Sequence, residues 1–202
     1  MEASNGLAAD HVHACGDFTA VVRQVPADRW TAPTPCTEWD ARALVEHVIG
    51  FHEFLLLRPL GVRAHRPRAG STARWLATER AIGAALRHPG LGEPVPHFDG
   101  DERRPVDVLR AITGDVLIHT WDLARSAGVS YRLDDGWCAA ALAAGPVGEH
   151  GSEGSSLFAP PVPVRSDASA PDRFLASRGR DPHWRPPPGG ATYEAVERPR
   201  PA

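Results

Sequence analysis

Residues 105–128 read PVDVLRAITGDVLIHTWDLARSAG. The stretch opens with a proline, which suits the first turn of a helix, and closes at Gly128, a residue type that favours a helix C-terminus. Between them apolar residues recur at helical spacing. We therefore expect one long and largely buried helix from Pro105 to Ala127.

One stripe of this helix changes along its length from apolar to ionisable. Val108, Ile112, Asp115, His119 and Asp122 follow one another at steps of 4, 3, 4 and 3, the spacing of a face that is normally apolar. Carboxylates on such a face are costly unless they are paired or bound to a cation. Asp115 and His119 stand at i and i+4, so one helix could supply both as ligands to a metal.

Three upstream segments also have helical spacing. The first covers residues 7–25, and its expected inward stripe is Val12, Cys15, Phe18, Thr19 and Val22. The second follows Thr37, the expected N-cap, with Asp40 as the acid of a capping box and Pro59 near its end. The third covers residues 71–86. With residues 105–127 these segments predict a four-helix bundle.

Later elements are shorter. Helices are expected over 135–144 and 170–178, and extended chain over 131–133 and 158–164. Prolines disqualify the last segment as a central strand, so the evidence for a sheet is thin. The predicted fold class is all-α: a four-helix bundle with a short extended and helical C-terminal extension.

The chain length favours one domain with a tail. We assign residues 1–181 to a metal-binding bundle in which 145–181 wraps outside the helices. Residues 182–202, rich in proline and glycine, are expected to form a flexible tail.

His47 is the candidate third ligand. The second helix has an apolar face formed by Leu44, Val48, Phe51 and Leu55. His47 lies on the same side of the helix, so it should point into the bundle. The alternative is a core histidine that donates to a backbone carbonyl. His47, Asp115 and His119 together offer two imidazoles and one carboxylate.

This donor set suits Zn²⁺ with an open coordination position, and Ni²⁺, Fe²⁺ and Mn²⁺ are alternatives. Asp122 is a candidate catalytic residue acting behind the metal ligands, where it could orient an imidazole. Pairing of Asp122 with Arg125 at the surface is the competing interpretation.

Composition excludes several chemistries. The chain has 22 basic and 25 acidic residues and a formal net charge of -3, which gives no case for nucleic acid or an anionic membrane as partner. Every basic residue is arginine. Schiff-base catalysis, a lysine-held pyridoxal phosphate and a Walker-type phosphate loop all need a lysine and are excluded.

The expected compartment is the cytoplasm. Cys15, Cys36 and Cys138 form no CxxC pair and are interpreted as free thiols. Residues 1–20 lack the pattern of a secretory signal. No segment approaches the roughly 18 apolar residues of a membrane helix.

Other candidates have simpler explanations. Cys36 precedes a helix start, where a thiol can be reactive, but packing is the commoner role. Trp39 and Trp121 are expected to pack the bundle, with pocket lining as the alternative. Arg42 and Arg125 could bind an anionic substrate, although solvated arginine is the simpler account.

The remaining histidines near the motifs are not expected to bind metal. His52 is five residues after His47, about 140° away on a helical wheel, and is expected at the surface. His11 and His13 are expected to be incidental.

Three motifs carry a family resemblance: residues 34–50, TPCTEWDARALVEHVIG; residues 114–128, GDVLIHTWDLARSAG; and residues 167–182, DASAPDRFLASRGRDP. Together they resemble the DinB/YfiT-like metalloprotein superfamily of actinobacteria, and more narrowly the mycothiol-dependent maleylpyruvate isomerase N-terminal-domain family. The bias to Ala, Arg, Gly and Pro is what a GC-rich actinobacterial genome would favour.

The resemblance implies a DinB-like bundle with a divalent metal on His47, Asp115 and His119, and mycothiol as cofactor or co-substrate. The leading expectation is an enzyme that activates mycothiol or a related thiol for transfer to, or isomerisation of, an electrophilic small molecule. Alternatives are a metal-dependent hydrolase using metal-bound water and a non-catalytic metal- or ligand-binding bundle. A homodimer is possible, and no nucleic acid or membrane partner is expected.

Overall fold

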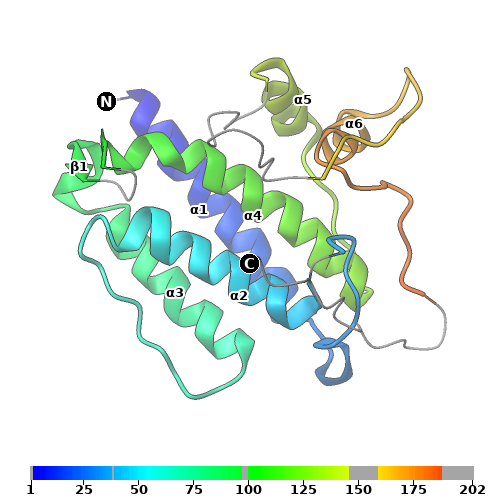
Figure 1. The fold of residues 1–202 in the computed structure, drawn as a ribbon, viewed down its shortest axis with the longest axis horizontal. Coiled ribbons are helices and arrows are strands. Elements are labelled where there is room, and N and C mark those ends of the chain that lie inside the picture. The colour runs from blue at the N-terminus through cyan, green and yellow to red at the C-terminus, as the bar shows by residue number, and fades with distance from the viewer. Residues whose placement is uncertain (1, 38, 97–99, 146–158, 188–202) are drawn as a thin grey trace, which may run out of the picture.

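Four long helices lie side by side in the computed structural model, which describes residues 2–37, 39–96, 100–145 and 159–187 (Figure 1). They are α1 (Glu2–Val22), α2 (Ala41–His52), α3 (Ser71–Ala85) and α4 (Pro105–Ala127). Helices α1 and α4 run in one direction, and α2 and α3 run in the other. Helix α4 packs against both α1 and α2. The predicted all-α four-helix bundle is confirmed.

Short elements connect these helices. They are the 3-10 helices η1 (Ala27–Arg29) and η3 (Pro89–Gly92), the π-helical turn η2 (Glu53–Leu57) and the antiparallel strands β1 (Val95–Pro96) and β2 (Glu102–Arg103). The two-residue strands were not expected from the sequence. The expected extended segment 131–133 has no regular structure, and Leu133 in it packs into the core.

Helix α4 has the predicted bounds. Pro105 stands in its first turn, and Gly128 closes it with a φ of 72°, a left-handed conformation that suits glycine. Most of its side chains are buried, because α1 and α2 pack against it and the C-terminal segment reaches it through the contact of Arg180 with Asp122. The largest fully buried apolar side chains on it are Leu109, Ile112, Ile118 and Leu123.

The described part of the C-terminal segment packs outside the four long helices. Helix α5 (Asp135–Ala143) and helix α6 (Ala170–Ser177) lie against each other, and the Trp137 and Phe174 rings meet edge to face with centroids 5.2 Å apart. The expected extended run 158–164 is described only from residue 159. Residues 146–158 of the wrap and 188–202 of the tail lie outside the described residues.

Helix α2 starts later than predicted. Asp40, not Thr37, is its N-cap, and the Asp40 carboxylate accepts a 2.7 Å hydrogen bond from the Ala43 N–H. The segment before it forms a turn in which the Thr34 hydroxyl contacts the carbonyls of Cys36 and Trp39. A capping box with Thr37 would need helical backbone where this turn lies.

The inward stripe of α1 is shifted from the prediction. Val12 is 56% exposed, and His11 is fully buried instead. Cys15, Phe18 and Val22 are buried as expected. The stripe therefore follows positions 11, 15, 18 and 22, and a histidine occupies a place that hydrophobicity alone assigned to its valine neighbour.

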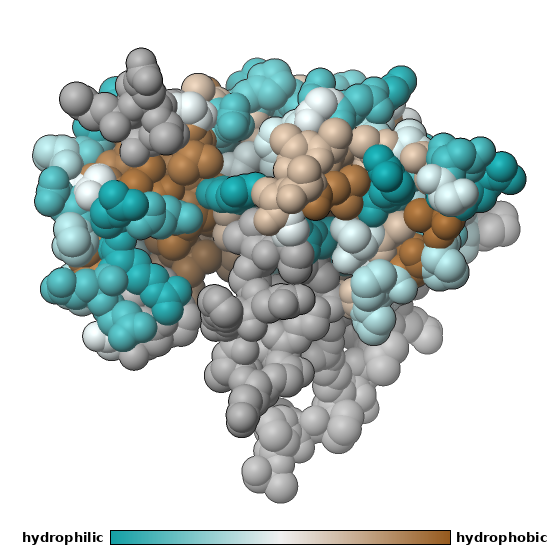
Figure 2. Space-filling model, turned by 90° about the horizontal axis from the view of Figure 1, so that it is seen from above, coloured by the Kyte–Doolittle hydropathy of each residue, from teal (hydrophilic) through white to brown (hydrophobic). Residues whose placement is uncertain are grey.

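Figure 2 shows the face on which α5 and α6 lie. Hydrophilic residues cover most of the described surface in this view, and hydrophobic residues show between them mainly on its left. Few large apolar side chains are exposed among the described residues; they are Val12, Phe54 and Val164. No helix in the described part of the chain is long and apolar enough to span a membrane.

A substitution at Gly179 tests how closely the C-terminal segment is packed. Its φ is +73°, and a Cβ added there would lie 2.6 Å from the Ala159 Cβ and 2.7 Å from the Ala159 carbonyl oxygen. We expect Gly179→Ala to lower the free energy of unfolding by at least about 1–2 kcal/mol, the usual cost of a left-handed alanine. Gly16→Ala is the control: its Cβ meets nothing within 4 Å in helix α1, so it should be neutral or stabilising. Equal effects of the two variants in urea unfolding would contradict this account.

Candidate metal centre

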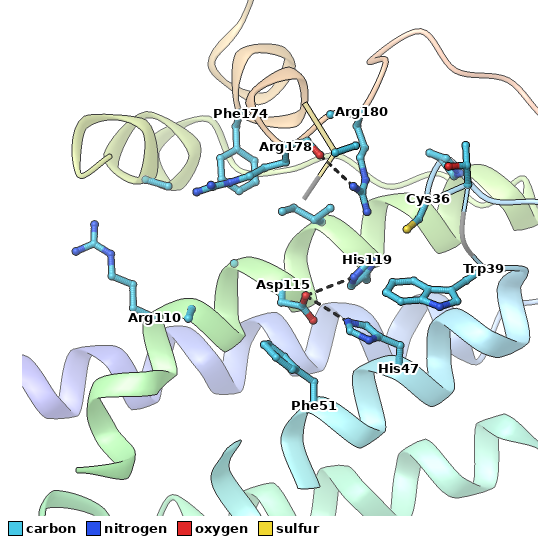
Figure 3. A pocket seen from close by; sticks show the side chains of 18 of the residues that line it. Cys36, Trp39, His47, Phe51, Arg110, Asp115, His119, Phe174, Arg178 and Arg180 are labelled. Atoms are coloured by element: carbon cyan, nitrogen blue, oxygen red, sulfur yellow. Dashed lines mark hydrogen bonds and ion pairs between the residues drawn. The ribbon is translucent and has the colours of Figure 1, made fainter. Parts of the chain in front are cut away.

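The structure brings together the three side chains that the sequence singled out. His47 comes from α2, and Asp115 and His119 come from successive turns of α4 (Figure 3). The Asp115 Oδ1 atom lies 3.5 Å from His47 Nε2 and 3.4 Å from His119 Nε2. One donor atom from each residue lies within 4.8 Å of the others. The three donors therefore surround a single point.

Hydrogen bonding fixes which atoms face that point. His119 Nδ1 lies 3.0 Å from Asp122 Oδ2, and a buried carboxylate accepts, so Nδ1 donates. In the neutral ring His119 Nε2 then carries a lone pair and faces the Asp115 carboxylate. The second oxygen of Asp115, Oδ2, is buried and has no hydrogen-bond partner among the described residues. Lone pairs that converge in this way need a cation between them.

The pKa shifts of His119 and Asp115 also indicate positive charge beside the Asp115 carboxylate. Burial works to lower the pKa of His119, but the Asp115 and Asp122 carboxylates outweigh it and raise that pKa to about 9. Burial works to raise the pKa of Asp115, and His119 and His47 hold it below its ordinary value instead. The pocket thus favours ionised Asp115 and positive charge beside it, supplied by a proton or by a metal.

Arg180 completes the arrangement, and sequence reasoning missed it. Its guanidinium donates to Asp122 through Nη2 at 3.0 Å and through Nε at 3.3 and 3.4 Å. Asp122 is fully buried and Arg180 is 4% exposed. The alternative of a surface pair between Asp122 and Arg125 is wrong. The only signal for Arg180 was its place within the motif 167–182.

His47 is held by aromatic rings at the edge of the bundle. Trp39 stacks on it with centroids 4.1 Å apart, and Phe51 lies 5.6 Å away on a nearly parallel plane. Its side chain is 26% exposed, so it faces the cavity described below more than the core. No bond from His47 to a backbone carbonyl is found among the described residues, which leaves Asp115 as its polar contact.

A cavity of about 310 Å³ opens beside these ligands. Its walls combine aromatic and aliphatic side chains from the turn before α2 and from α2, α4, α5 and α6, namely Trp39, Phe51, Ile118, Trp137 and Phe174. Arg110, Arg178 and Arg180 also line it, as does Cys36. This is the size and composition of a small-molecule site.

The other candidate residues from the sequence lie in different places, some at the cavity wall and some in the core or at the surface. Trp39 lines the cavity, whereas Trp121 is buried in the core as expected. Cys36 is buried at the cavity wall, so it is a packed residue close to the site. Arg125 lies over the Trp121 ring, 5.2 Å from its centroid, and Arg42 is exposed away from the cavity.

Two histidines expected to be unimportant are fully buried. His52 was predicted at the surface, but its ring faces His11 with centroids 5.1 Å apart and Trp75 at 5.7 Å. The reason is that the core side of α2 runs through positions 44, 48 and 52, not through 47 and 51. Burial lowers the pKa of His11 to about 3 and that of His52 to about 4. His13 is largely exposed, as expected.

The buried pair Asp122–Arg180 can be tested by unfolding of the metal-free protein. We expect Asp122→Ala to cost about 3–5 kcal/mol, because it leaves the Arg180 charge buried without a partner. The double variant Asp122→Leu/Arg180→Met removes both charges and should recover most of that loss. A remainder of about 1–3 kcal/mol would report the unpaired His119 N–H. A double variant no more stable than Asp122→Ala would show that the pair is not the source of the effect.

Comparison with known proteins gives the family of the chain. Residues 11–124 match the family described as the mycothiol maleylpyruvate isomerase N-terminal domain. Uncharacterized proteins from two Mycobacterium tuberculosis strains, CDC 1551 / Oshkosh and ATCC 25618 / H37Rv, are each 34% identical over 184 residues, covering 84% of this chain and 95% of the relative. No solved structure gives a significant match. The predicted resemblance is confirmed, and the chain belongs to the mycothiol maleylpyruvate isomerase N-terminal domain family.

Proposed function

We propose that the protein is a divalent-metal-dependent enzyme in which mycothiol or a related thiol is activated for transfer to, or isomerisation of, an electrophilic small molecule. One observation supports it above the others. In a chain of this family, two imidazoles and one carboxylate with an unpartnered buried oxygen converge on one point in the wall of a ligand-sized cavity.

The donor set fits a catalytic metal. His47 Nε2, His119 Nε2 and Asp115 would hold Zn²⁺, or Ni²⁺, Fe²⁺ or Mn²⁺, with a position open toward the cavity. When bound, such a metal lowers the pKa of a thiol and holds the resulting thiolate beside the electrophile.

The chain's own residues position these ligands. Asp122 accepts from His119 Nδ1–H, which keeps the Nε2 lone pair directed at the site. Arg180 in turn donates to the Asp122 carboxylate and holds it in place. We therefore assign Asp122 the role of a positioning residue, which acts through the imidazole that it orients.

The cavity suggests what kind of substrate binds. Apolar and aromatic walls exclude water from the reacting atoms, whereas Arg110 and Arg178 bring positive charge to the same space. Arg178 lies over the Phe174 ring, 5.7 Å from its centroid, so its guanidinium is held at the wall. We propose an electrophile with an unsaturated or apolar body and an anionic group, such as an unsaturated carboxylate.

The proposed setting is the cytoplasm, where low-molecular-weight thiols stay reduced. The partners are then the thiol and the electrophile alone. A homodimer stays a prediction.

The decisive experiment incubates the purified full chain, loaded with Zn²⁺, with a panel of thiols including mycothiol and a panel of unsaturated and halogenated electrophiles. Mass spectrometry follows thiol incorporation and isomerisation. Consumption that requires thiol supports the proposal. Consumption at the same rate without thiol would indicate a metal-dependent hydrolase instead, and no consumption would favour a non-catalytic metal- or ligand-binding bundle.

His47→Ala tests the metal ligands. Because it removes one of three donors and lies at the edge of the core, we expect it to remove one equivalent of tightly bound Zn²⁺ and the thiol-dependent activity. Helicity by circular dichroism should be unchanged. His13→Ala, on an exposed histidine, is the control and should keep both. Unreduced zinc content in His47→Ala, measured by elemental analysis, would rule out the proposed triad.

Arg110→Ala tests the proposed anionic group. Arg110 is exposed at the cavity, away from the ligand atoms, so its loss should weaken substrate binding more than the chemical step. We expect KM for an anionic electrophile to rise roughly 3- to 10-fold with kcat nearly unchanged. Arg42→Ala, exposed outside the cavity, should leave both constants unchanged. An equal rise in KM for a neutral electrophile would argue against charge recognition.

A further inference from the structure

A second cluster of metal-ligand side chains lies in the core, with no residue in common with the centre described above. His11 and Cys15 come from successive turns of α1, and His52 comes from the end of α2, just before the π-helical turn. Their exposed fractions are 0%, 3% and 0%. One donor atom from each lies within 4.8 Å of the others.

Hydrogen bonds fix the orientation of His52. Its Nδ1 lies 2.6 Å from the carbonyl oxygen of Val48, and a carbonyl only accepts, so Nδ1 carries the proton. The neutral ring therefore directs the lone pair of Nε2 into the cluster.

His11 is oriented in the same sense. Its Nδ1 lies 3.0 Å from the Thr113 hydroxyl oxygen, and that hydroxyl donates to the Leu109 carbonyl at 2.7 Å. The hydroxyl has one hydrogen, so toward His11 it accepts and His11 Nδ1 donates. The Nε2 lone pair of His11 then also points into the cluster.

The two Nε2 atoms lie 3.2 Å apart, and in these tautomers neither nitrogen carries a proton that it could donate to the other. Cys15 Sγ lies 3.6 Å from His11 Nε2 and 4.0 Å from His52 Nε2. A thiol has one hydrogen and can satisfy one of the two nitrogens. An added proton would bring a positive charge into the core, where no carboxylate is hydrogen-bonded to either ring among the described residues. A Cu⁺ ion that converts Cys15 to a thiolate would leave the cluster neutral, and a Zn²⁺ ion would have one of its two charges balanced by the thiolate.

The distances fit a metal ion. A tetrahedral ion with bonds of about 2.0–2.1 Å to nitrogen and 2.3 Å to sulfur separates its nitrogen ligands by about 3.3 Å and nitrogen from sulfur by about 3.6 Å. The observed separations of 3.2, 3.6 and 4.0 Å lie close to these values. Little ligand movement would be needed.

We propose that His11, Cys15 and His52 form a second, structural metal site for a thiophilic d¹⁰ ion, Zn²⁺ or Cu⁺. Thiolate and imidazole are the ligands that these ions prefer. The three side chains are closed to solvent, and a bound ion would fasten α1 to α2 through the middle of the bundle.

Cobalt substitution tests the proposal because it reports sulfur directly. The metal-free full chain is titrated anaerobically with Co²⁺, and the near-ultraviolet thiolate-to-cobalt charge-transfer band is followed. We expect that band to grow to one equivalent in the wild type and in His47→Ala, and to be absent in Cys15→Ala. Cys138→Ala removes another buried cysteine, outside the cluster, and should keep it.

X-ray absorption on the wild type identifies the native ion and needs no variant. One sulfur and two imidazoles in the Zn²⁺ or Cu⁺ coordination shell support the site, and the edge energy distinguishes the two ions. Shells with nitrogen and oxygen only, or a charge-transfer band that survives in Cys15→Ala, would overturn it. A proton on His11 Nε2 in the metal-saturated protein, seen by ¹⁵N NMR, would also overturn it, because the cluster would then be a hydrogen-bonded chain. None of these readouts depends on catalysis, so the proposed function can fail while this site stands.

Discussion

The buried contact of Asp122 with Arg180 and His119 is the interaction on which the site depends. Asp122 is fully buried, and it is tolerable there because a guanidinium and an imidazole N–H share its charge. Arg180 follows α6, whereas Asp122 and His119 lie on α4. The same contact therefore closes the C-terminal segment over the cavity and selects the His119 nitrogen that faces it. The packing of the C-terminal segment and the orientation of His119 therefore depend on the same contact.

Local signals explain how much the sequence could predict. Proline and glycine mark both ends of α4, and the i, i+4 spacing of Asp115 and His119 places them on one face whatever surrounds the helix. Arg180 has no such signal. It comes from irregular chain 58 residues beyond Asp122, and its partner is set by how the C-terminal segment folds back. Pairings of that kind follow from tertiary structure, which periodicity does not encode.

The histidines show a second limit of sequence reasoning. A helical wheel gives the angle between His47 and His52, but the neighbouring helices decide which of these two sides of α2 faces the core. In this bundle α1 and α3 cover the side with His52, and the cavity lies on the side with His47. The helical-wheel angle alone placed His52 at the surface, and His11 was expected to be incidental. Neutral rings with satisfied Nδ1 atoms are acceptable in the core.

Both clusters direct imidazole Nε2 lone pairs by hydrogen bonding at Nδ1, yet they differ in the acceptor. Behind His119 the acceptor is a carboxylate, which makes the ring a stronger donor to a cation and adds negative charge near an accessible centre. Behind His11 and His52 the acceptors are neutral oxygens, and within the three-residue cluster the Cys15 thiol is the group that can become negatively charged. A divalent ion bound through nitrogen and oxygen is therefore favoured beside the cavity, and an ion that prefers sulfur is favoured in the core. Helix α2 supplies one histidine to each set, and α4 supplies two ligands of the first set and the Thr113 hydroxyl that orients His11 in the second. The bundle therefore holds an accessible ligand set on one side of α2 and a closed one on the other.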